Sequence, residues 1–229
     1  MPPSTPLARS KTAALARITD SIPKGYTRYT SGSIKAAKAE ALARKFHQLY
    51  GIGCTPAQRL TRRKHDLASC VLVMYWPDGA DLVHWLMLAT EGAGLDGKHE
   101  PMHLVSDKPR MRWLGYELTR YAVRGRVAWT WTRPAAEMAE HYAMLAELQN
   151  KRHAGAVSDL LQRLANQPGF HGVRAQTWDL CQEARRRGHT ADIPHIFYVQ
   201  KVSHGDRLDL VTMPLKIIRT NSDKLSARN

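Results

Sequence analysis

Acidic residues are scarce in this chain. Its 229 residues include 20 Asp and Glu against 34 Lys and Arg, so the formal net charge at pH 7 is +14 and the pI is near 10.0. Such an excess of cations usually indicates a polyanionic partner, because side chains that neutralise phosphates release condensed counterions. We therefore expect nucleic acid, RNA or DNA, as the partner, accompanied by other protein subunits.

Long apolar runs and cysteines are also few. No run approaches the roughly 18 residues that span a bilayer, and the longest, residues 70–76 and 82–89, are typical of strands. The three cysteines, Cys54, Cys70 and Cys181, are far apart, which excludes a paired-cysteine framework and a cysteine-based zinc site. The N-terminus lacks the apolar core of a secretory signal. We expect a cytoplasmic protein with no membrane contact and no cofactor.

The hydrophobic content of 43% is enough for a packed core, and its patterning predicts an α+β fold of antiparallel hairpins packed with a helical segment. Residues 1–32 predict a flexible basic arm, because prolines interrupt any periodicity there. Residues 33–133 predict a helix over 34–49, with Ser33 as its N-cap, followed by two hairpins. Three helices are expected within 134–190, at 134–150, 156–166 and 171–187. A hairpin and a basic tail are expected over 191–229. Residues 33–215 are expected to form one compact unit.

The hairpins are expected where strand-like runs flank turn residues. The first joins 69–76 to 82–90, the second joins 110–121 to 125–133, and the third joins 195–202 to 207–213. In the second hairpin, Trp129 and Trp131 alternate with small residues, which favours a core face for both. Tyr121 near its tip is the better candidate for stacking on a base.

Basic residues form clusters, and arginine forks suit bidentate contact with phosphate. The candidate nucleic-acid contacts are Lys35, Lys38, Arg44, Lys45, Arg59, Arg62, Arg63, Lys64, Arg110, Arg112, Tyr121, Arg124, Arg126, Arg174, Arg185, Arg186 and Arg187. An alternative for Arg185–Arg187 is that they stabilise the carboxyl end of a helix. Residues 166–189 also resemble the turn and second helix of a helix-turn-helix, with Arg174, Gln176 and Trp178 at the start of the reading helix.

One catalytic pattern is present. His99, Glu100 and His103 match H-E-x-x-H, which on a helix places two imidazoles on zinc with Glu as general base. Pro101 stands between the two histidines, and proline inside a helix costs roughly 3 kcal/mol. We therefore interpret the segment as a polar loop and expect no metal and no catalytic residues. The alternative is zinc on His99 and His103, with Glu100 as the base.

Two stretches, residues 113–132 (WLGYELTRYAVRGRVAWTWT) and 168–188 (PGFHGVRAQTWDLCQEARRRG), together resemble small basic proteins of conjugative plasmids and other bacterial mobile elements. The similarity covers roughly residues 70–200. One such setting is the plasmid-borne type IV CRISPR effector complex, whose Cas8-like subunits hold the guide end and inspect the target duplex. The resemblance implies a mobile-element context, and the cysteine zinc motif of some such subunits is missing here.

The sequence thus favours a non-enzymatic nucleic-acid-binding protein of a bacterial mobile element, as a subunit of a ribonucleoprotein contacting guide RNA or target DNA. Two alternatives stay open. One is a hydrolase or nuclease that uses the HEPMH segment or works without metal. The other is a protein-only adaptor or inhibitor, in which the basic surface contacts an acidic partner.

Overall fold

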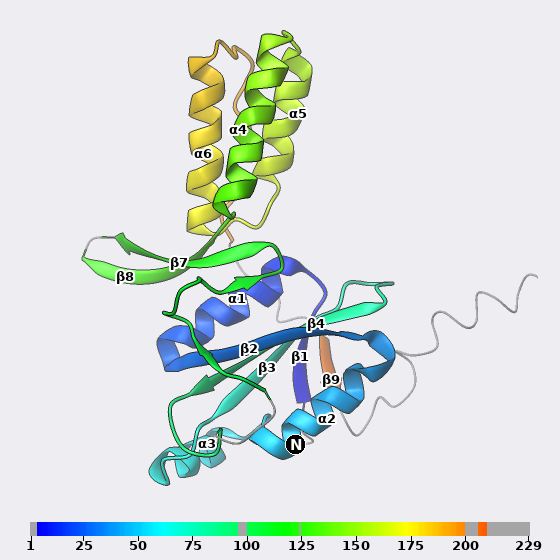
Figure 1. Ribbon diagram of the computed structural model, residues 1–229, viewed down its shortest axis with the longest axis vertical. Helices are drawn as coiled ribbons and strands as arrows, with labels where there is room; N and C mark the ends of the chain where they lie inside the picture. The colour runs from blue at the N-terminus through cyan, green and yellow to red at the C-terminus, as the bar shows by residue number, and fades with distance from the viewer. Residues whose placement is uncertain (1–3, 96–99, 124, 200–205, 210–229) are drawn as a thin grey trace, which may run out of the picture. The chain divides into compact units, whose positions relative to one another are not determined.

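The chain divides into two units in a computed structural model that describes residues 4–95, 100–123, 125–199 and 206–209 (Figure 1). The first unit comprises Met1–Asp107 with Ser203–Asn229, and the second comprises Lys108–Val202. The range 33–215, expected as one compact unit, is thus divided after Asp107. Separate helices and largely antiparallel strands confirm the expected α+β class. Every helix among the described residues is too short or too polar to span a bilayer.

The first unit is built on a mixed six-stranded sheet with the order β5-β2-β4-β3-β1-β9. Only β1 and β3 pair in parallel; the other neighbours are antiparallel. The described elements are β1 (Ser4–Ala8), α1 (Lys11–Ser21), the 3-10 helix η1 (Ile22–Lys24), β2 (Tyr26–Lys35), η2 (Ala36–Lys38), α2 (Ala39–Tyr50), α3 (Pro56–Lys64), β3 (Cys70–Tyr75), β4 (Leu82–Thr90), β5 (His103–Leu104) and β9 (Asp206–Asp209).

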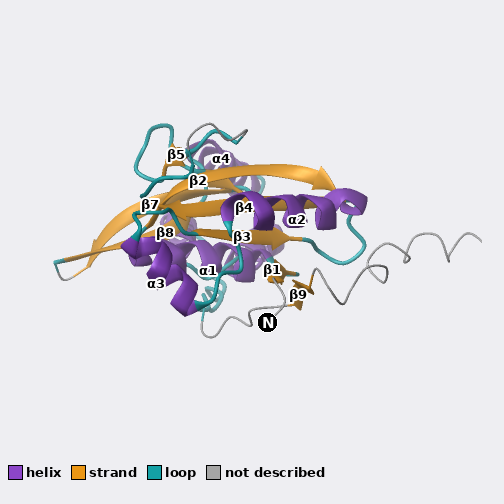
Figure 2. Cartoon of the chain, turned by 90° about the horizontal axis from the view of Figure 1, so that it is seen from below, coloured by secondary structure: helices purple, strands orange, loops and turns teal. Residues whose placement is uncertain are grey.

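Helices cover both faces of this sheet (Figures 1 and 2). On one face, Phe46 of α2 is fully buried in a cluster with Leu72 and Met74 of β3. On the other face lies α1, whose Leu15 and Ile18 are also fully buried. Alternation along β3 and β4 therefore supplies two apolar faces, which explains why these strands are continuous hydrophobic runs in the sequence.

The expectation of a flexible arm over residues 1–32 is wrong for the described part of that range. β1 pairs with both β3 and β9, and Leu7 is 1% exposed. The buried Thr5 hydroxyl lies 2.8 Å from His47 Nε2 of α2, and α1 begins at an N-cap formed by Ser10. Pro23 lies in the first turn of η1, where the missing N–H of proline leaves no hydrogen bond unmade.

The expected helix over 34–49 begins later than its periodicity suggests. β2 runs to Lys35, which pairs with Leu82 of β4, and α2 begins only at Ala39. A close approach explains Gly32 in this strand: a Cβ there would lie 2.8 Å from the Trp85 ring. Ser33, expected to cap the helix, is a strand residue. The hairpin of β3 and β4 is confirmed, with Cys70 opposite Ala89.

The second unit contains a three-stranded sheet, β6-β7-β8, and three helices. Its described elements are β6 (Arg112–Trp113), β7 (Tyr116–Val123), β8 (Arg126–Thr132), α4 (Ala135–Asn150), α5 (Ala154–Ala165) and α6 (His171–Arg186). These confirm the second hairpin and the three helices. Trp131 is fully buried, as expected, and Trp129 is half-buried under the Arg120 guanidinium at 4.8 Å.

The expected third hairpin, 195–202 with 207–213, is not formed by the residues described. Residues 189–199 contain neither helix nor strand and belong to the second unit, while β9 pairs with β1 in the first. Ile193 and Ile196 pack against the core of the helical bundle instead. These two apolar residues therefore pack on the helices and do not form part of a strand.

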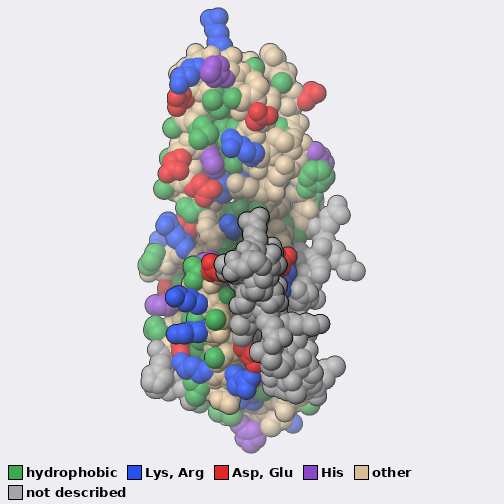
Figure 3. All heavy atoms as spheres, turned by 90° about the vertical axis from the view of Figure 1, so that its right-hand side faces the viewer, with side chains coloured by type: hydrophobic (Ala, Val, Ile, Leu, Met, Phe, Trp, Pro, Cys, Tyr) green, Lys and Arg blue, Asp and Glu red, His purple; other side chains and the backbone are tan. Residues whose placement is uncertain are grey.

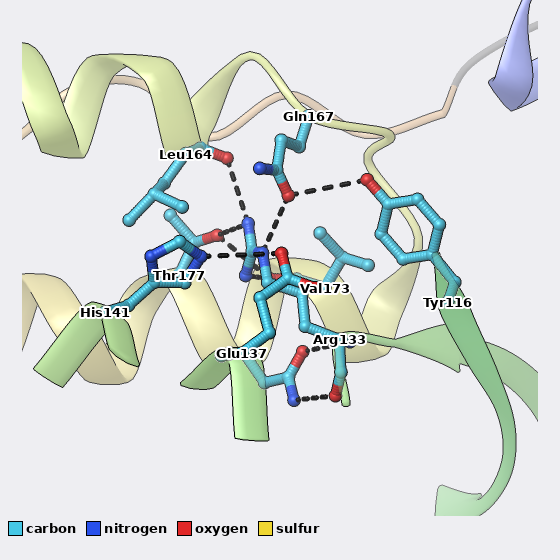
Figure 4. Close-up of polar contacts among 9 residues, drawn as sticks. Tyr116, Arg133, Glu137, His141, Leu164, Gln167, Val173 and Thr177 are labelled. Carbon is cyan, nitrogen blue, oxygen red and sulfur yellow. Dashed lines mark hydrogen bonds and ion pairs between the residues drawn. The ribbon is translucent and has the colours of Figure 1, made fainter. Parts of the chain in front are cut away.

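Arg133 joins β8 to the helices from inside the second unit (Figure 4). It is 1% exposed, and its guanidinium donates to Gln167 Oε1 (2.7 Å), Val173 O (3.2 Å), Leu164 O (3.2 Å) and Thr177 Oγ1 (2.9 Å). All four acceptors are neutral. Burial lowers the pKa of Arg133, and the nearby Tyr116 and Glu137 oppose this shift; arginine nevertheless stays protonated in proteins.

Gly172, the second residue of α6, allows that helix to approach β8 closely. A Cβ at this position would lie 2.5 Å from both Trp131 O and Thr132 Cγ2, and the Gly172 N–H donates to Thr130 Oγ1 at 3.0 Å. The amino end of α6 is therefore fixed on the sheet by contact with backbone.

Replacing Arg133 with Met should reduce the free energy of unfolding by about 2–4 kcal/mol, because buried acceptors lose a charged donor. Urea denaturation followed by circular dichroism measures this. The matched control is Arg163→Met on the exposed surface of α5, which should change stability by no more than about 0.5 kcal/mol. Equal losses in the two variants would contradict the structural role given to Arg133.

Two glycine substitutions should change the free energy of unfolding in opposite directions. Gly172→Ala should destabilise by about 1–3 kcal/mol, because the added methyl meets backbone that cannot move cheaply. Gly155→Ala, at the same position in α5, meets nothing within 4 Å and should stabilise by up to about 1 kcal/mol through helix propensity. Thermal and urea unfolding of both variants check the pair, and a Gly172→Ala protein as stable as the original would exclude the tight contact.

Candidate nucleic-acid interface

The basic residues near α2 divide into free and paired groups. Lys35 and Lys38 are exposed, whereas Arg44 forms an ion pair with Glu40 one turn earlier. Lys45 pairs with Glu100 at 2.6 Å. Two of these four predicted contacts are thus already held by carboxylates, which weakens their attraction for phosphate.

α3 is the most cationic element of the first unit. It starts at a capping box, in which Thr55 accepts from the Gln58 N–H and the Gln58 side chain accepts from the Thr55 N–H. None of its nine residues is buried. Its sequence, PAQRLTRRK, contains four cations and no acid. Further Lys and Arg side chains are visible in Figure 3, which looks from the side opposite α3 in Figure 1.

The four cations of α3 have different roles. Arg62 donates from Nε and Nη2 to Ala68 O, at 3.0 and 2.6 Å, so it ties the helix to the start of β3. Arg59 donates to Cys54 O at 2.8 Å. Arg63 and Lys64 are exposed at the end of the helix. The Tyr26 phenol lies nearby: burial raises its pKa, while the charges of Arg59 and Arg63 oppose that rise.

The HEPMH segment is not a helix where the structure describes it, from Glu100 onward. Glu100 accepts hydrogen bonds from Lys45 and from the Tyr50 hydroxyl. His103 begins β5, opposite Tyr29, with its ring 5.7 Å from the tyrosine ring. No group of three metal-ligating side chains occurs among the described residues, and His99 lies outside them. Glu100 is therefore a structural anion that holds this loop on α2.

The pKa values of this contact follow from its geometry. Burial alone raises the pKa of Glu100, but the hydrogen bonds and charge of Lys45 and the bond from Tyr50 outweigh it, so the pKa falls below its ordinary value. Burial and the bond to Glu100 raise the pKa of Tyr50. A carboxylate with a lowered pKa, whose two oxygens already accept hydrogen bonds, is a poor general base.

The candidate residues of the second hairpin are only partly free. Arg110 is exposed, and Arg112 donates to Glu117 at 2.7 Å. Tyr121 stacks on His171 of α6, with centroids 4.2 Å apart and planes at 8°. Arg124 lies outside the described residues, and so does the side chain of Arg126.

At the carboxyl end of α6, the arginines serve the helix itself. Arg186 and Arg187 both pair with Glu183, and Arg185 donates to His189 O at 3.0 Å. These contacts agree with the alternative interpretation of this cluster as helix-end stabilisation. Gln176 is one of the three residues that the helix-turn-helix interpretation places at the start of the DNA-reading helix. Its side chain instead bonds to the backbone N–H and carbonyl of Arg133.

Arg174 and Trp178, in contrast, line a groove of about 560 Å³ together with His171 and Ala175. The opposite wall is formed by residues 193–196, which return along α6 (Figure 1). Arg174 donates to Ile196 O at 3.5 Å, and its guanidinium carbon lies 3.3 Å from the centre of the Tyr198 ring. Arg174 and Trp178, expected together on one helix, thus share this groove with His171, the stacking partner of Tyr121.

Sequence reasoning missed His171 and the wall at 193–196. The spacing of His171, Arg174 and Trp178, at i, i+3 and i+7, could have indicated a shared helix face. No local signal could have placed residues 193–196, because their position depends on contacts with α6 and the bundle core.

Comparisons of this chain with protein-family models, with curated proteins and with solved structures found no match.

Glu100→Gln should reduce stability at pH 7 by about 1 kcal/mol, because it removes a charged partner from Lys45 and Tyr50. Since the folded-state pKa lies below the ordinary value of 4.5, this difference should persist above that pH and vanish as pH falls through the folded value. Urea titrations at several pH values measure it.

The control is Glu147→Gln, which removes an exposed partner of Lys151 at the same 2.6 Å distance. That variant should show a much smaller change at every pH. A difference for Glu100→Gln that grows on acidification would contradict the assignment of an ionised, bonded carboxylate.

Proposed function

We propose that the protein binds nucleic acid, with α3 as a principal phosphate-contacting element. The observation that supports this most directly is the exposure of a nine-residue helix that carries four cations and no acid. Two of those cations, Arg63 and Lys64, lie exposed, while Arg59 and Arg62 hold the helix in place. The proposal includes the expected setting, a ribonucleoprotein of a bacterial mobile element.

Electrostatics favours a polyanion over a small anion as the ligand. The net charge of +14 is spread over both units, and several exposed cations of the first unit sit at the ends of β2 and α3. A flexible anionic polymer can neutralise many such charges at once and release a counterion for each. Binding of this kind weakens steeply as the salt concentration rises, and it depends little on the sequence of the nucleic acid.

The hydrolase alternative finds less support than binding does. Its general base would be Glu100, whose oxygens already accept bonds from Lys45 and Tyr50. Its second imidazole, His103, belongs to a strand and not to the helix that aims two imidazoles at one ion.

The double variant Arg63→Gln/Lys64→Gln should weaken binding to a fluorescent duplex or single strand and reduce the slope of log K against log salt by about 1–2. Fluorescence anisotropy between about 50 and 200 mM salt measures both quantities. Arg152→Gln/Arg163→Gln, which removes the same charge from exposed positions of the bundle, is the matched control and should change the slope less.

Three outcomes would contradict the proposal. Affinity that does not change with salt would exclude phosphate contacts. Equal losses in the two double variants would assign binding to net charge and not to α3. Tighter binding to polyglutamate than to either nucleic acid would favour an acidic protein partner.

A further inference from the structure

One face of α6 carries three side chains that can contact a planar, anionic ligand. His171, Arg174 and Trp178 are spaced by three and four residues, so they follow one another along about 10 Å of helix. All three line the groove, and Trp178 is 52% exposed although it is a large aromatic residue. The inner face of the same helix packs inside the unit, where the buried Val173 and Thr177 accept hydrogen bonds from Arg133.

The opposite wall is fixed in place by specific contacts. Val199 N–H donates to Gly169 O at 3.2 Å, and a Cβ on Gly169 would lie 2.3 Å from Phe197 O. Ile193 and Ile196 pack on the bundle core. The groove is therefore part of the packed structure of the second unit.

The groove's chemistry suits an unpaired nucleotide. Its lining contains Arg174, two histidines and an exposed indole, and none of its lining residues is acidic. The bond to Ile196 O uses only Nε of Arg174, one of five donors that a guanidinium offers. Exposed aromatic faces beside arginine are the recurring site for unstacked bases. In a duplex the base faces are covered by their neighbours, so only a single strand can present one to Trp178.

We propose that this groove binds unpaired nucleotides of single-stranded nucleic acid, with a base stacked on Trp178 and a phosphate at Arg174. This inference rests on the proposed function and adds strand selectivity to it. Charge complementarity argues for this occupant over an apolar peptide, because the Arg174 guanidinium without a lining carboxylate favours an anion.

The test compares Trp178→Leu with the unmodified protein on single strands of about 12 nucleotides, as DNA and as RNA, and on a duplex of the same length. Single-strand affinity should fall roughly 5- to 100-fold, since stacking of one base contributes about 1–3 kcal/mol. Duplex affinity should stay unchanged. Trp178→Phe should keep most of the single-strand affinity, because it retains an aromatic face. Tyr142→Leu, an exposed aromatic of α4 outside the groove, is the matched control and should have no effect.

A second variant tests the phosphate contact. Arg174→Gln should reduce the single-strand salt slope by about 0.7 and leave the duplex slope unchanged. Loss of single-strand preference in both Trp178→Leu and Arg174→Gln supports the groove.

If Trp178→Leu binds both forms as the original does, or weakens both equally, the groove proposal falls while nucleic-acid binding stands. If polyglutamate displaces the single strand from the unmodified protein but not from Arg174→Gln, the groove recognises charge alone and the stacking proposal falls. If neither form binds, both proposals fall.

Discussion

The second unit depends on one buried cation. Arg133 is 1% exposed, and removing a guanidinium from water costs several kcal/mol unless polar groups replace the hydration. Its donors reach oxygens of Leu164, Gln167 and Thr177, among others, so the end of α5, the turn after it and the first half of α6 must meet at one point. Because α6 is fixed from its inner face, the side chains on its outer face lie at defined positions.

Local patterns were sufficient to predict the parts of the fold whose partners lie nearby in sequence. The hairpins β3–β4 and β7–β8 are joined by short turns, and α4, α5 and α6 show helical periodicity over more than ten residues each. The stretch before residue 33 was misinterpreted because the partners that order it are distant. β1 needs β3 and β9, which lie more than 60 and about 200 residues away, and composition carries no trace of that pairing.

The candidate site shows the same limit. Charge identified Arg63 and Lys64 as cations but could not separate them from Arg62 and Arg187, which bond within the protein. That distinction depends on where a backbone carbonyl or a carboxylate lies after folding. Likewise, Pro101 argued against a helix at the HEPMH segment, and the part described from Glu100 onward is not helical. Nothing in the sequence indicated, however, that Glu100 would bind Lys45 and Tyr50.

The two proposed contact regions differ in the physics that would control them. Contacts from α3 would be Coulombic and would weaken as salt displaces them, whereas stacking in the α6 groove buries apolar surface and depends little on ionic strength. A strand that reaches both would gain through the second site at an effective concentration set by the strand's own length. Raising the salt should therefore remove duplex binding before single-strand binding, because only the single strand retains a contact that counterions do not compete for.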